Sequence, residues 1–536
     1  MNARSPCIIR RATAILFLVT APAMAGSPAH PWQYLGRGPN AWDDGQSDSC
    51  TGSAAPAPRV LCVRAGAAPG GNGTSAAPFA SINAAIGTAA SGDIVQVAAG
   101  TYAENVALGS FTAPSSVDLI LRGGFNADFS VRDAGTYRSV INGGDVAPSV
   151  QLHQDSSGTS VLDGFEITNG RGLGVDWQDG NGAGGGVFVQ RLGNGETRIS
   201  HNEIHNNQTA HFGDDARGGG IHAETQNWGG ATGTLRIEDN YVHHNAAGRG
   251  AGIDVQGRQA ALLRNRIELN TGHSDHGGGL YVSTIEASVR DSVFRSNEIG
   301  ASVGYGWGGG AIVAGDGLVA EFSGNVFTDN YAPSIGSGIF WDEGATGSHH
   351  NDLFFANRCT LDGRQGTAIY VDGGAAPSVV ELDHVTIADH ICPGTTDSGN
   401  ITGGVVHVEL LSEVDVHNSI LWNNTREFGH DDTATTVNVS WSISAQAGTG
   451  NFLADPLFAD PASGDYHLRS SAGRYTPGGF VNDAQDSPAI DAGDPLSAFD
   501  QETDPNGGLA NLGAYGNTPE ASRSGAALRV FRNGFE

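Results

Sequence analysis

One pattern of polar and apolar positions repeats through the middle of the chain. An Asn is followed by any residue, a large apolar residue, two more residues and a second Asn, as in NYVHHN (residues 240–245). From Asn207 to Asn357 the second Asn of successive copies steps by 38, 25, 27, 33 and 27 residues. A Gly-rich corner and a short apolar strand, such as GGGLYV, follow each copy. A period of this length with the same strands in every copy predicts a solenoid.

The strand segments predict an all-β fold, a right-handed parallel β-helix. They are too short for helices, alternate polar and apolar positions, and are rich in Val, Ile and Phe. We expect Asn at the corner to adopt the left-handed conformation and to hydrogen-bond its neighbours along the stack. The glycines let the backbone turn where a Cβ would clash. The apolar residues expected to stack inward are Ile204, Val242, Ile267, Phe294, Phe327 and Phe354.

Composition supports an ordered fold with many corners and restricts the partners. Gly accounts for 80 residues, yet 39% of the chain is still hydrophobic. The formal net charge is -29 and all 28 basic residues are Arg. Because such a field repels phosphate backbones, nucleic acid is excluded as an expected partner.

The N-terminus predicts export. Residues 1–25 combine Arg residues, the apolar run ATAILFLVTA and an Ala-Met-Ala cleavage site, as in a secretory signal peptide. No later apolar run approaches 18 residues, so we expect no transmembrane segment. After a linker over residues 26–59, the mature chain is expected to act as a monomer that is secreted or held in the periplasm or at the cell surface.

Four cysteines remain after cleavage, which allows three pairings in principle. Cys359 lies two residues after Asn357, and Cys392 lies two after His390 in the degenerate motif IADH. The register therefore stacks Cys359 on Cys392, and we expect that disulfide together with Cys50–Cys62.

The repeats resemble a known group of exported proteins. GGGI, GGGL and GGGA alternate with FRSN, FTDN and FFAN, which resembles the GGAI and FxxN repeats of polymorphic outer-membrane proteins and, more broadly, the pectin lyase-like superfamily. Residues 70–106 resemble the segment that opens many exported β-helix proteins, where a short amphipathic helix, here about residues 79–89, caps the first coil.

The C-terminal part carries a second resemblance. Residues 486–517 resemble the choice-of-anchor Q segment that follows such helices, and the final VFRNGFE resembles a short tail of some exported bacterial proteins. We therefore expect a β-helix over residues 60–445, the anchor-like segment over 446–520 and a tail over 521–536. The superfamily contains lyases, hydrolases and adhesins, so the resemblance implies fold and export more than chemistry.

Inserts of varying length lie between each second Asn and the next glycines, and the register places all of them along one edge. Two long inserts flank two short ones, and this arrangement predicts a groove. The long inserts start three coils apart, about 14 Å, which is wide enough for a sugar chain. The predicted floor holds Arg249, His273, Asp275 and His276, and the walls hold His211, Asp214 and Asp215 on one side and Tyr305 and Trp307 on the other.

This groove favours glycan or surface binding, with catalysis as the alternative. Asp214 or Asp215 and Asp275 start two coils apart, about 9.6 Å, near the upper limit for inverting glycosidases. In a polysaccharide lyase, Arg249 would neutralise a uronate or act as base. The NTD, paired-Asp, GHG and RIK motifs of polygalacturonases are missing from the sequence. A purely structural envelope component is the third hypothesis.

Other candidate residues have both functional and structural interpretations. The HSDH stretch at His273–His276 offers metal ligands or is a solvated turn. Trp177 is a candidate sugar-binding platform or packs under a loop. Asp500, Glu502, Asp504 and Asn506 alternate before two glycines like the start of a calcium loop, but Asn511 replaces the bidentate Glu of an EF-hand, so an Asx-rich loop is the alternative.

Overall fold

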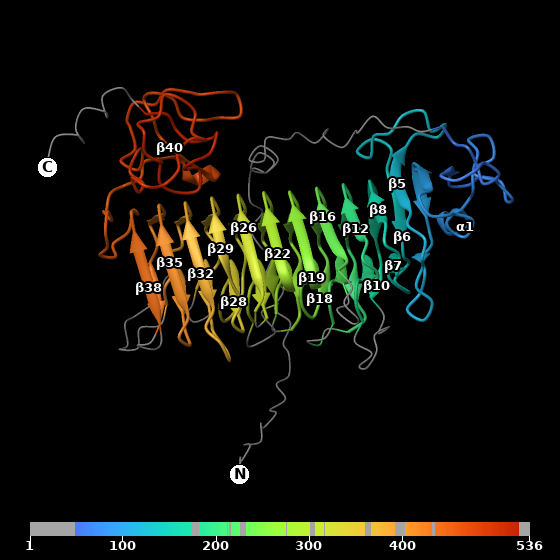
Figure 1. The fold of residues 1–536 in the computed structure, drawn as a ribbon, viewed down its shortest axis with the longest axis horizontal. Helices are drawn as coiled ribbons and strands as arrows, with labels where there is room; N and C mark the ends of the chain where they lie inside the picture. Colours follow the sequence, from blue (N-terminus) through green and yellow to red (C-terminus); the bar gives the residue numbers. More distant parts are fainter. Residues whose placement is uncertain are drawn as a thin grey trace, which may run out of the picture.

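The computed structural model describes residues 49–172, 182–211, 213, 216–225, 232–274, 276–300, 306–315, 317–359, 366–391, 403–430 and 435–524. The chain winds into a right-handed parallel β-helix, which confirms the predicted fold class. Its coils follow one another in chain order from the helix α1 to strand β38 (Figure 1).

Each central coil contributes strands to three long columns and one short one. Strands of neighbouring coils pair in parallel and in register, as Ile253 does with Leu280. The first-column strands are β4 (Val106–Leu108), β7 (Val150–Gln154), β11 (Val187–Arg191), β15 (Ile221–Thr225), β25 (Ala311–Ala314), β28 (Ile339–Asp342), β31 (Ile369–Val371), β34 (Val406–Val408) and β37 (Phe428–His430).

The second column lies in the same sheet. Its strands are β1 (Val60–Val63), β2 (Ile94–Ala98), β5 (Ile120–Phe125), β8 (Thr159–Asp163), β12 (Glu196–Ser200), β16 (Thr234–Glu238), β26 (Val319–Ser323), β29 (Thr346–His350), β32 (Val379–Asp383), β35 (Glu413–His417) and β38 (Thr436–Ser440). Two 11-residue strands, β19 (Ile253–Leu263) and β22 (Leu280–Arg290), run through both columns.

The remaining columns close the coil. The third-column strands are β3 (Gly100–Tyr102), β6 (Ser139–Asn142), β9 (Phe165–Thr168), β13 (Glu203–His205), β17 (Tyr241–His243), β20 (Arg266–Glu268), β23 (Val293–Arg295), β27 (Val326–Thr328), β30 (Leu353–Phe355), β33 (Thr386–Ala388) and β36 (Ile420–Trp422). Short corner strands follow in five coils: β10 (Arg171–Gly172), β14 (Gln208–Thr209), β18 (Ala246–Ala247), β21 (Thr271–Gly272) and β24 (Glu298–Ile299).

The core is a stack of alternate side chains from these strands. All six apolar residues predicted to point inward are buried. The rings of Phe294, Phe327 and Phe354 stack almost parallel, with centroids 4.6 Å apart at each step. The position predicted from the Asn motif therefore lies inside the coil, as expected from strand alternation.

The Asn residues form hydrogen-bonded ladders at two corners. Asn270 Oδ1 accepts from Asn245 N at 3.0 Å and from Asn245 Nδ2 at 3.1 Å, while Asn270 Nδ2 donates to Val242 O at 3.0 Å. The same contacts recur between Asn270 and Asn297. The predicted hydrogen bonding along the stack is thus confirmed.

The predicted backbone conformation of these Asn residues is wrong by one position. The left-handed residue is the one before each ladder Asn, such as His244 with φ 52° or Leu269 with φ 55°. The chain turns at that residue, so the Asn side chain that follows is directed back into the corner, where it meets the next coil.

The glycine corners have the predicted role. Gly277, the first of its triplet, has φ 63°, which favours glycine. A Cβ on Gly279, the third, would lie 2.4 Å from the carbonyl oxygen of Gly310 in the next coil. A side chain on Gly279 would therefore require the next coil to move.

A short helix covers the first coil. Helix α1 (Ile82–Ile86) is five residues long, shorter than the predicted span of about 79–89. Ser81 is extended and caps it, and the backbone N–H groups of Ile82 and Asn83 donate to Glu104. The cap fixes where the helix begins, and Ile82 is buried against the first coil.

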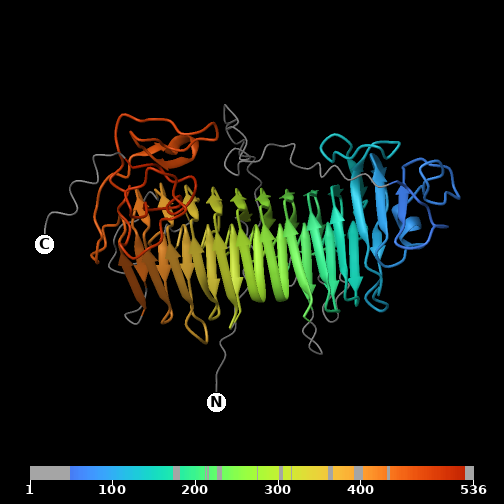
Figure 2. The ribbon, with the colours of Figure 1, turned by 45° about the horizontal axis from the view of Figure 1, so that its top comes forward.

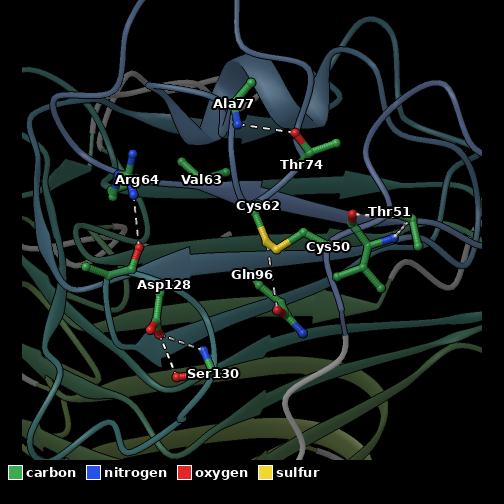
Figure 3. The surroundings of a disulfide bond; sticks show 12 residues. Cys50, Thr51, Cys62, Val63, Arg64, Thr74, Ala77, Gln96, Asp128 and Ser130 are labelled. Carbon is green, nitrogen blue, oxygen red and sulfur yellow. Dashed lines mark hydrogen bonds between the residues drawn. A yellow bond between two sulfur atoms is a disulfide. The ribbon is translucent and has the colours of Figure 1, made fainter.

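The cysteine predictions have different outcomes. Cys50 and Cys62 form the expected disulfide, which ties the chain before β1 to the buried start of the solenoid (Figure 3). Cys359 is disulfide-bonded, and its Sγ lies 3.6 Å from the carbonyl oxygen of Ile391. Cys392 lies outside the described residues, so its pairing with Cys359 remains a prediction.

The chain after the last coil folds back along the solenoid. Residues 452–524, here called the C-terminal cap, contain β39 (Phe458–Asp460), the 3-10 helix η2 (Pro461–Ser463) and β40 (Asp465–Leu468), and lie beside the last coils (Figures 1 and 2). Their apolar side chains pack on the outer face of β30, β33 and β36. Tyr466 Oη donates to Asp389 at 2.6 Å, and Asn351 Nδ2 donates to Gly516 O at 2.7 Å.

Within the described ranges, the structure contains no helix that is long and apolar enough to cross a membrane.

We expect Asn270→Ala to lower the free energy of unfolding by about 2–3 kcal/mol, because the buried N–H of Asn245 loses its acceptor. Urea unfolding followed by circular dichroism measures the change. Asn438→Ala, on the exposed face of β38, is the matched control and should stay within about 0.5 kcal/mol of the parent. Equal effects of the two substitutions would contradict the role of the ladder.

Candidate functional site

Three of the predicted groove residues lie at equivalent positions just before the glycine corners. Arg249, His276 and Trp307 belong to successive coils, and Arg217 precedes them. Bridges pair Arg217 with Arg249 and His276 with Trp307, while Gly250 N donates to His276 O at 3.3 Å. This row of four half-exposed side chains is called the corner row.

The HSDH stretch is only partly a surface feature. Ser274 is buried, and its Oγ donates to Gly248 O at 2.7 Å in the preceding coil. The His273 side chain is half-buried, and the loss of hydration lowers its pKa. His276 meets Trp307 edge-on, with ring centroids 4.8 Å apart. The turn is therefore fixed to its neighbours on both sides.

The other predicted groove residues are not assembled by the described structure. His211 is exposed. The residues Asp214, Asp215, Asp275, Tyr305 and Trp177 lie outside the described residues. The predicted carboxylate pair of a hydrolase thus stays a prediction.

The structure adds a buried ion network that the sequence analysis missed. His222 on β15 and Asp254 on β19 lie side by side on the outer face of the first column, and both are buried. Asp254 accepts from Arg249 Nε at 3.0 Å, and its Oδ1 lies 3.0 Å from His222 Nδ1. Gln256 Nε2 donates to the same carboxylate at 2.7 Å. Arg249 of the corner row is therefore fixed by a carboxylate beneath it.

The network holds its members in their charged forms. Burial alone would raise the pKa of Asp254, but the charge of Arg249 and the hydrogen bond with His222 outweigh it and hold that pKa well below its usual range. Burial alone would lower the pKa of His222, but hydrogen bonds with Asp254 and Glu224 raise it to about 9. An imidazolium and a guanidinium therefore share one buried carboxylate at neutral pH, with Glu224 3.8 Å from His222 Nε2.

Beyond the network, most later coils have an aromatic ring at the strand position of His222 and Asp254. Tyr281, Phe340, Tyr370 and His407 occupy the position equivalent to Asp254 in later coils. The Arg249 guanidinium lies 4.2 Å from the Tyr281 ring centroid. Phe340 and Tyr370 meet at 5.3 Å, and Tyr370 stacks on His407 at 5.1 Å. These buried rings support the half-exposed side chains around them.

We call the resulting surface the first-column face. It consists of half-exposed side chains from four successive coils, which the buried network and rings hold in place. Its members are Arg217, Glu224, Arg249, Gln256, His276 and Trp307.

The sequence contained a signal for the missed residues. GGGIHA, GAGIDV and GGGLYV place His222, Asp254 and Tyr281 at one position when aligned on their glycines. Each looks like an ordinary outward position of its own strand, and only the register between coils shows that they touch.

The predicted calcium ligands point in different directions. Glu502 is buried, and its Oε1 accepts from Asn511 N at 2.7 Å and from Asn517 N at 2.9 Å. Asp500 and Asp504 are exposed. Among the described residues, no three His, Cys, Asp or Glu side chains are grouped so as to hold a metal ion. Calcium binding by this loop, including Asn506, remains a prediction that its geometry does not support.

Comparisons with known proteins give one family match over part of the chain and several distant structural matches. A family model described as "Disaggregatase related" matches residues 331–493. No curated protein matches. The pectate lyase Pel9A matches with a TM-score of 0.41 and 13% identity, covering 86% of this chain and 97% of its own. A rhamnogalacturonan lyase matches with a TM-score of 0.34 and 12% identity, covering 80% and 96%.

A third solved structure, the pectin methylesterase from Aspergillus niger, matches with a TM-score of 0.30 and 14% identity over 57% of this chain and 88% of its own. The class of the chain, a right-handed parallel β-helix protein, rests on its own strand ladders. The resemblances to polymorphic outer-membrane proteins and to the choice-of-anchor Q segment stay predictions.

We expect the His222 imidazole to remain protonated through pH 8, because the carboxylates beside it stabilise the cation. Its stabilising contribution is fully present below about pH 6.5 and disappears as the pH rises through about 9. NMR of protein labelled at histidine Cε1 measures the midpoint, with His222→Gln assigning the signal. Asp254→Asn should lower the midpoint, and a parent midpoint at or below 6.5 would contradict the network.

We expect the C-terminal cap to lose stability as the pH rises from about 4.5 to about 7. Burial raises the pKa of Glu502 to about 7, so the unfolded chain ionises first and ionisation then opposes folding. Glu502→Gln should remove this loss, which amounts to about 3 kcal/mol above pH 7. Unfolding midpoints of the parent and the variant at pH 5 and pH 8 test this. If the difference in unfolding midpoint between the parent and Glu502→Gln is the same at pH 5 and pH 8, the raised pKa of Glu502 is refuted.

Proposed function

We propose that the protein binds glycans across the first-column face. The observation that supports this is the set of half-exposed polar and aromatic side chains from four successive coils, two of which are fixed by buried partners. Arg249 is fixed by Asp254 and the Tyr281 ring, and Gln256 by Asp254. Groups that are already ordered lose little entropy when a ligand binds.

The spacing of the face suits an extended sugar chain. From Arg217 to Trp307 it spans three coil steps, about 14 Å at the usual strand spacing. Trp307 offers an apolar ring to the face of a sugar, while Arg and Glu side chains hydrogen-bond hydroxyl or carboxylate groups. Export, as the N-terminal segment predicts, would bring this face to extracellular or cell-surface glycans.

Cleavage of a polysaccharide at the same face is the alternative. The observation that favours it is the cluster of His222, Asp254 and Arg249, because strongly shifted pKa values gather at catalytic sites. A lyase would use Arg249 near a uronate, and a hydrolase would need the carboxylates Asp214 or Asp215 and Asp275. Ion networks that only support a surface shift pKa values in the same way, so binding is the primary proposal.

We expect Trp307→Ala and Arg249→Ala each to weaken binding to a polysaccharide about tenfold or more, equivalent to about 1.4 kcal/mol. Affinity electrophoresis in gels containing acidic or neutral polysaccharides measures the retention. Arg138→Ala is the control, since Arg138 is exposed and ion-paired with Glu166 but precedes β6 of the third column. Retardation that is unchanged in both variants would refute the proposal.

Incubating the protein with the same polysaccharides in solution separates binding from catalysis. Unsaturated products and new reducing ends are followed with and without EDTA. Turnover that Asp275→Asn abolishes would establish the enzymatic alternative with that residue in it, and unchanged turnover would remove Asp275 from the mechanism. Retention without any product supports binding.

A further inference from the structure

A groove lies on the outer face of the second column, next to the first-column face along β19. It crosses β12, β16, β19, β22 and β26 and has a volume of about 590 Å³. None of the residues that line it belongs to the groove predicted from the inserts. The lining residues used below are Arg236, Gln259, Ala261, Glu286, Ser288 and Glu321.

The register explains why the surface is hollow here. Arg236, Ala261, Ser288 and Glu321 occupy one outward position in four successive coils. The two short side chains lie between two long ones, so the surface sinks over two coils. From Arg236 to Glu321 the row spans three coil steps, about 14 Å.

The neighbouring outward row forms a polar side of the hollow. Gln259 and Glu286 pair in register beside Ala261 and Ser288, and Gln259 Nε2 donates to Glu286 Oε2 at 2.7 Å. Arg290 Nε donates to Ser288 Oγ at 2.9 Å. Amide, carboxylate and hydroxyl groups thus surround a floor that includes the Ala261 methyl group.

The charges of the lining disfavour an anionic ligand. Glu196, Glu286 and Glu321 contribute three carboxylates, against one lining cation. That cation, Arg236, is 2.8 Å from Glu238. Arg290 lies 3.3 Å from Glu321 and Arg198 lies 3.9 Å from Glu196, so these four carboxylates and three guanidinium groups leave one net negative charge. A uronate polymer would therefore meet repulsion here, whereas carboxylates and amides readily accept hydrogen bonds from uncharged hydroxyl groups.

We propose that this second-column groove binds an uncharged oligosaccharide of two or three sugar units. The length of the row matches such a segment, the lining supplies hydrogen-bond acceptors for its hydroxyl groups, and the carboxylates exclude its acidic analogues. The site is separate from the first-column face and does not depend on glycan binding there.

The main test uses a variant, Ser288→Trp, that fills the groove with a large side chain. Isothermal titration calorimetry is run with uncharged hexasaccharides of glucose, mannose, xylose and galactose, with a galacturonate hexamer and with spermine. At least one uncharged hexasaccharide should bind the full chain, and Ser288→Trp should weaken it tenfold or more. Ser348→Trp is the matched control, because Ser348 lies in the same outward row two coils beyond Ser288 but does not line the groove.

A conservative variant tests the selectivity without filling the groove. Glu286→Gln/Glu321→Gln removes two carboxylates and keeps their shapes. The uncharged ligand should bind this variant within about threefold of the parent, and the galacturonate hexamer should gain affinity. A neutral ligand should also bind equally at low and high salt, since it makes no ion pairs to screen.

Several outcomes would overturn the proposal. The first is that no uncharged hexasaccharide binds. The second is that an uncharged hexasaccharide binds Ser288→Trp as tightly as it binds the parent. The third is that spermine binds more tightly than every sugar and is displaced by salt. Arg249→Ala and Trp307→Ala should leave binding in this groove unchanged. Their effects on the first-column face therefore distinguish a failure of this proposal from a failure of the proposed function.

Discussion

The hydrogen bonding of Asn side chains between coils is the constraint on which the rest of the structure depends. A parallel solenoid buries the backbone N–H groups of its corners, and a buried donor without an acceptor is costly. Each ladder Asn supplies an acceptor to the coil before it and a donor to that coil's carbonyl, as Asn270 does for Asn245 and Val242. Because the ladder tolerates only one register, it aligns strands that are 25 to 38 residues apart in the chain.

That register turns separate strands into continuous faces with different chemistry. On the first column it places a carboxylate, an imidazolium and a guanidinium next to a row of aromatic rings. On the second column it places two short side chains between two long ones and leaves a hollow. Burying the Asp254 ion pairs gains little net stability, because desolvation offsets the attraction. Their effect is to hold Arg249 and its neighbours in one arrangement.

The solenoid carries a different additional structure near each of its ends. Helix α1 covers the first coil, while the C-terminal cap folds along the side of the last coils and packs on β30, β33 and β36. The cap is joined to the coils by hydrogen bonds from Tyr466 and Asn351 as well as by apolar contacts. An exposed end would present unpaired strand edges, which are prone to association.

The solenoid and its inward positions could be predicted from the amino-acid sequence, because they follow from local rules: alternation along a strand, Asn and Gly at corners, and the spacing of repeats. The Cys50–Cys62 disulfide was also predicted correctly. The sequence did not show how distant segments contact one another. It did not determine which Asn-corner residue is left-handed, where α1 begins, or that Glu502 turns inward, because these depend on contacts with other coils. The same holds for the site. Arg249, His276 and Trp307 could be placed on one edge by counting, whereas His222 and Asp254 become partners only when β15 and β19 lie side by side, since each is an ordinary polar position within its own strand.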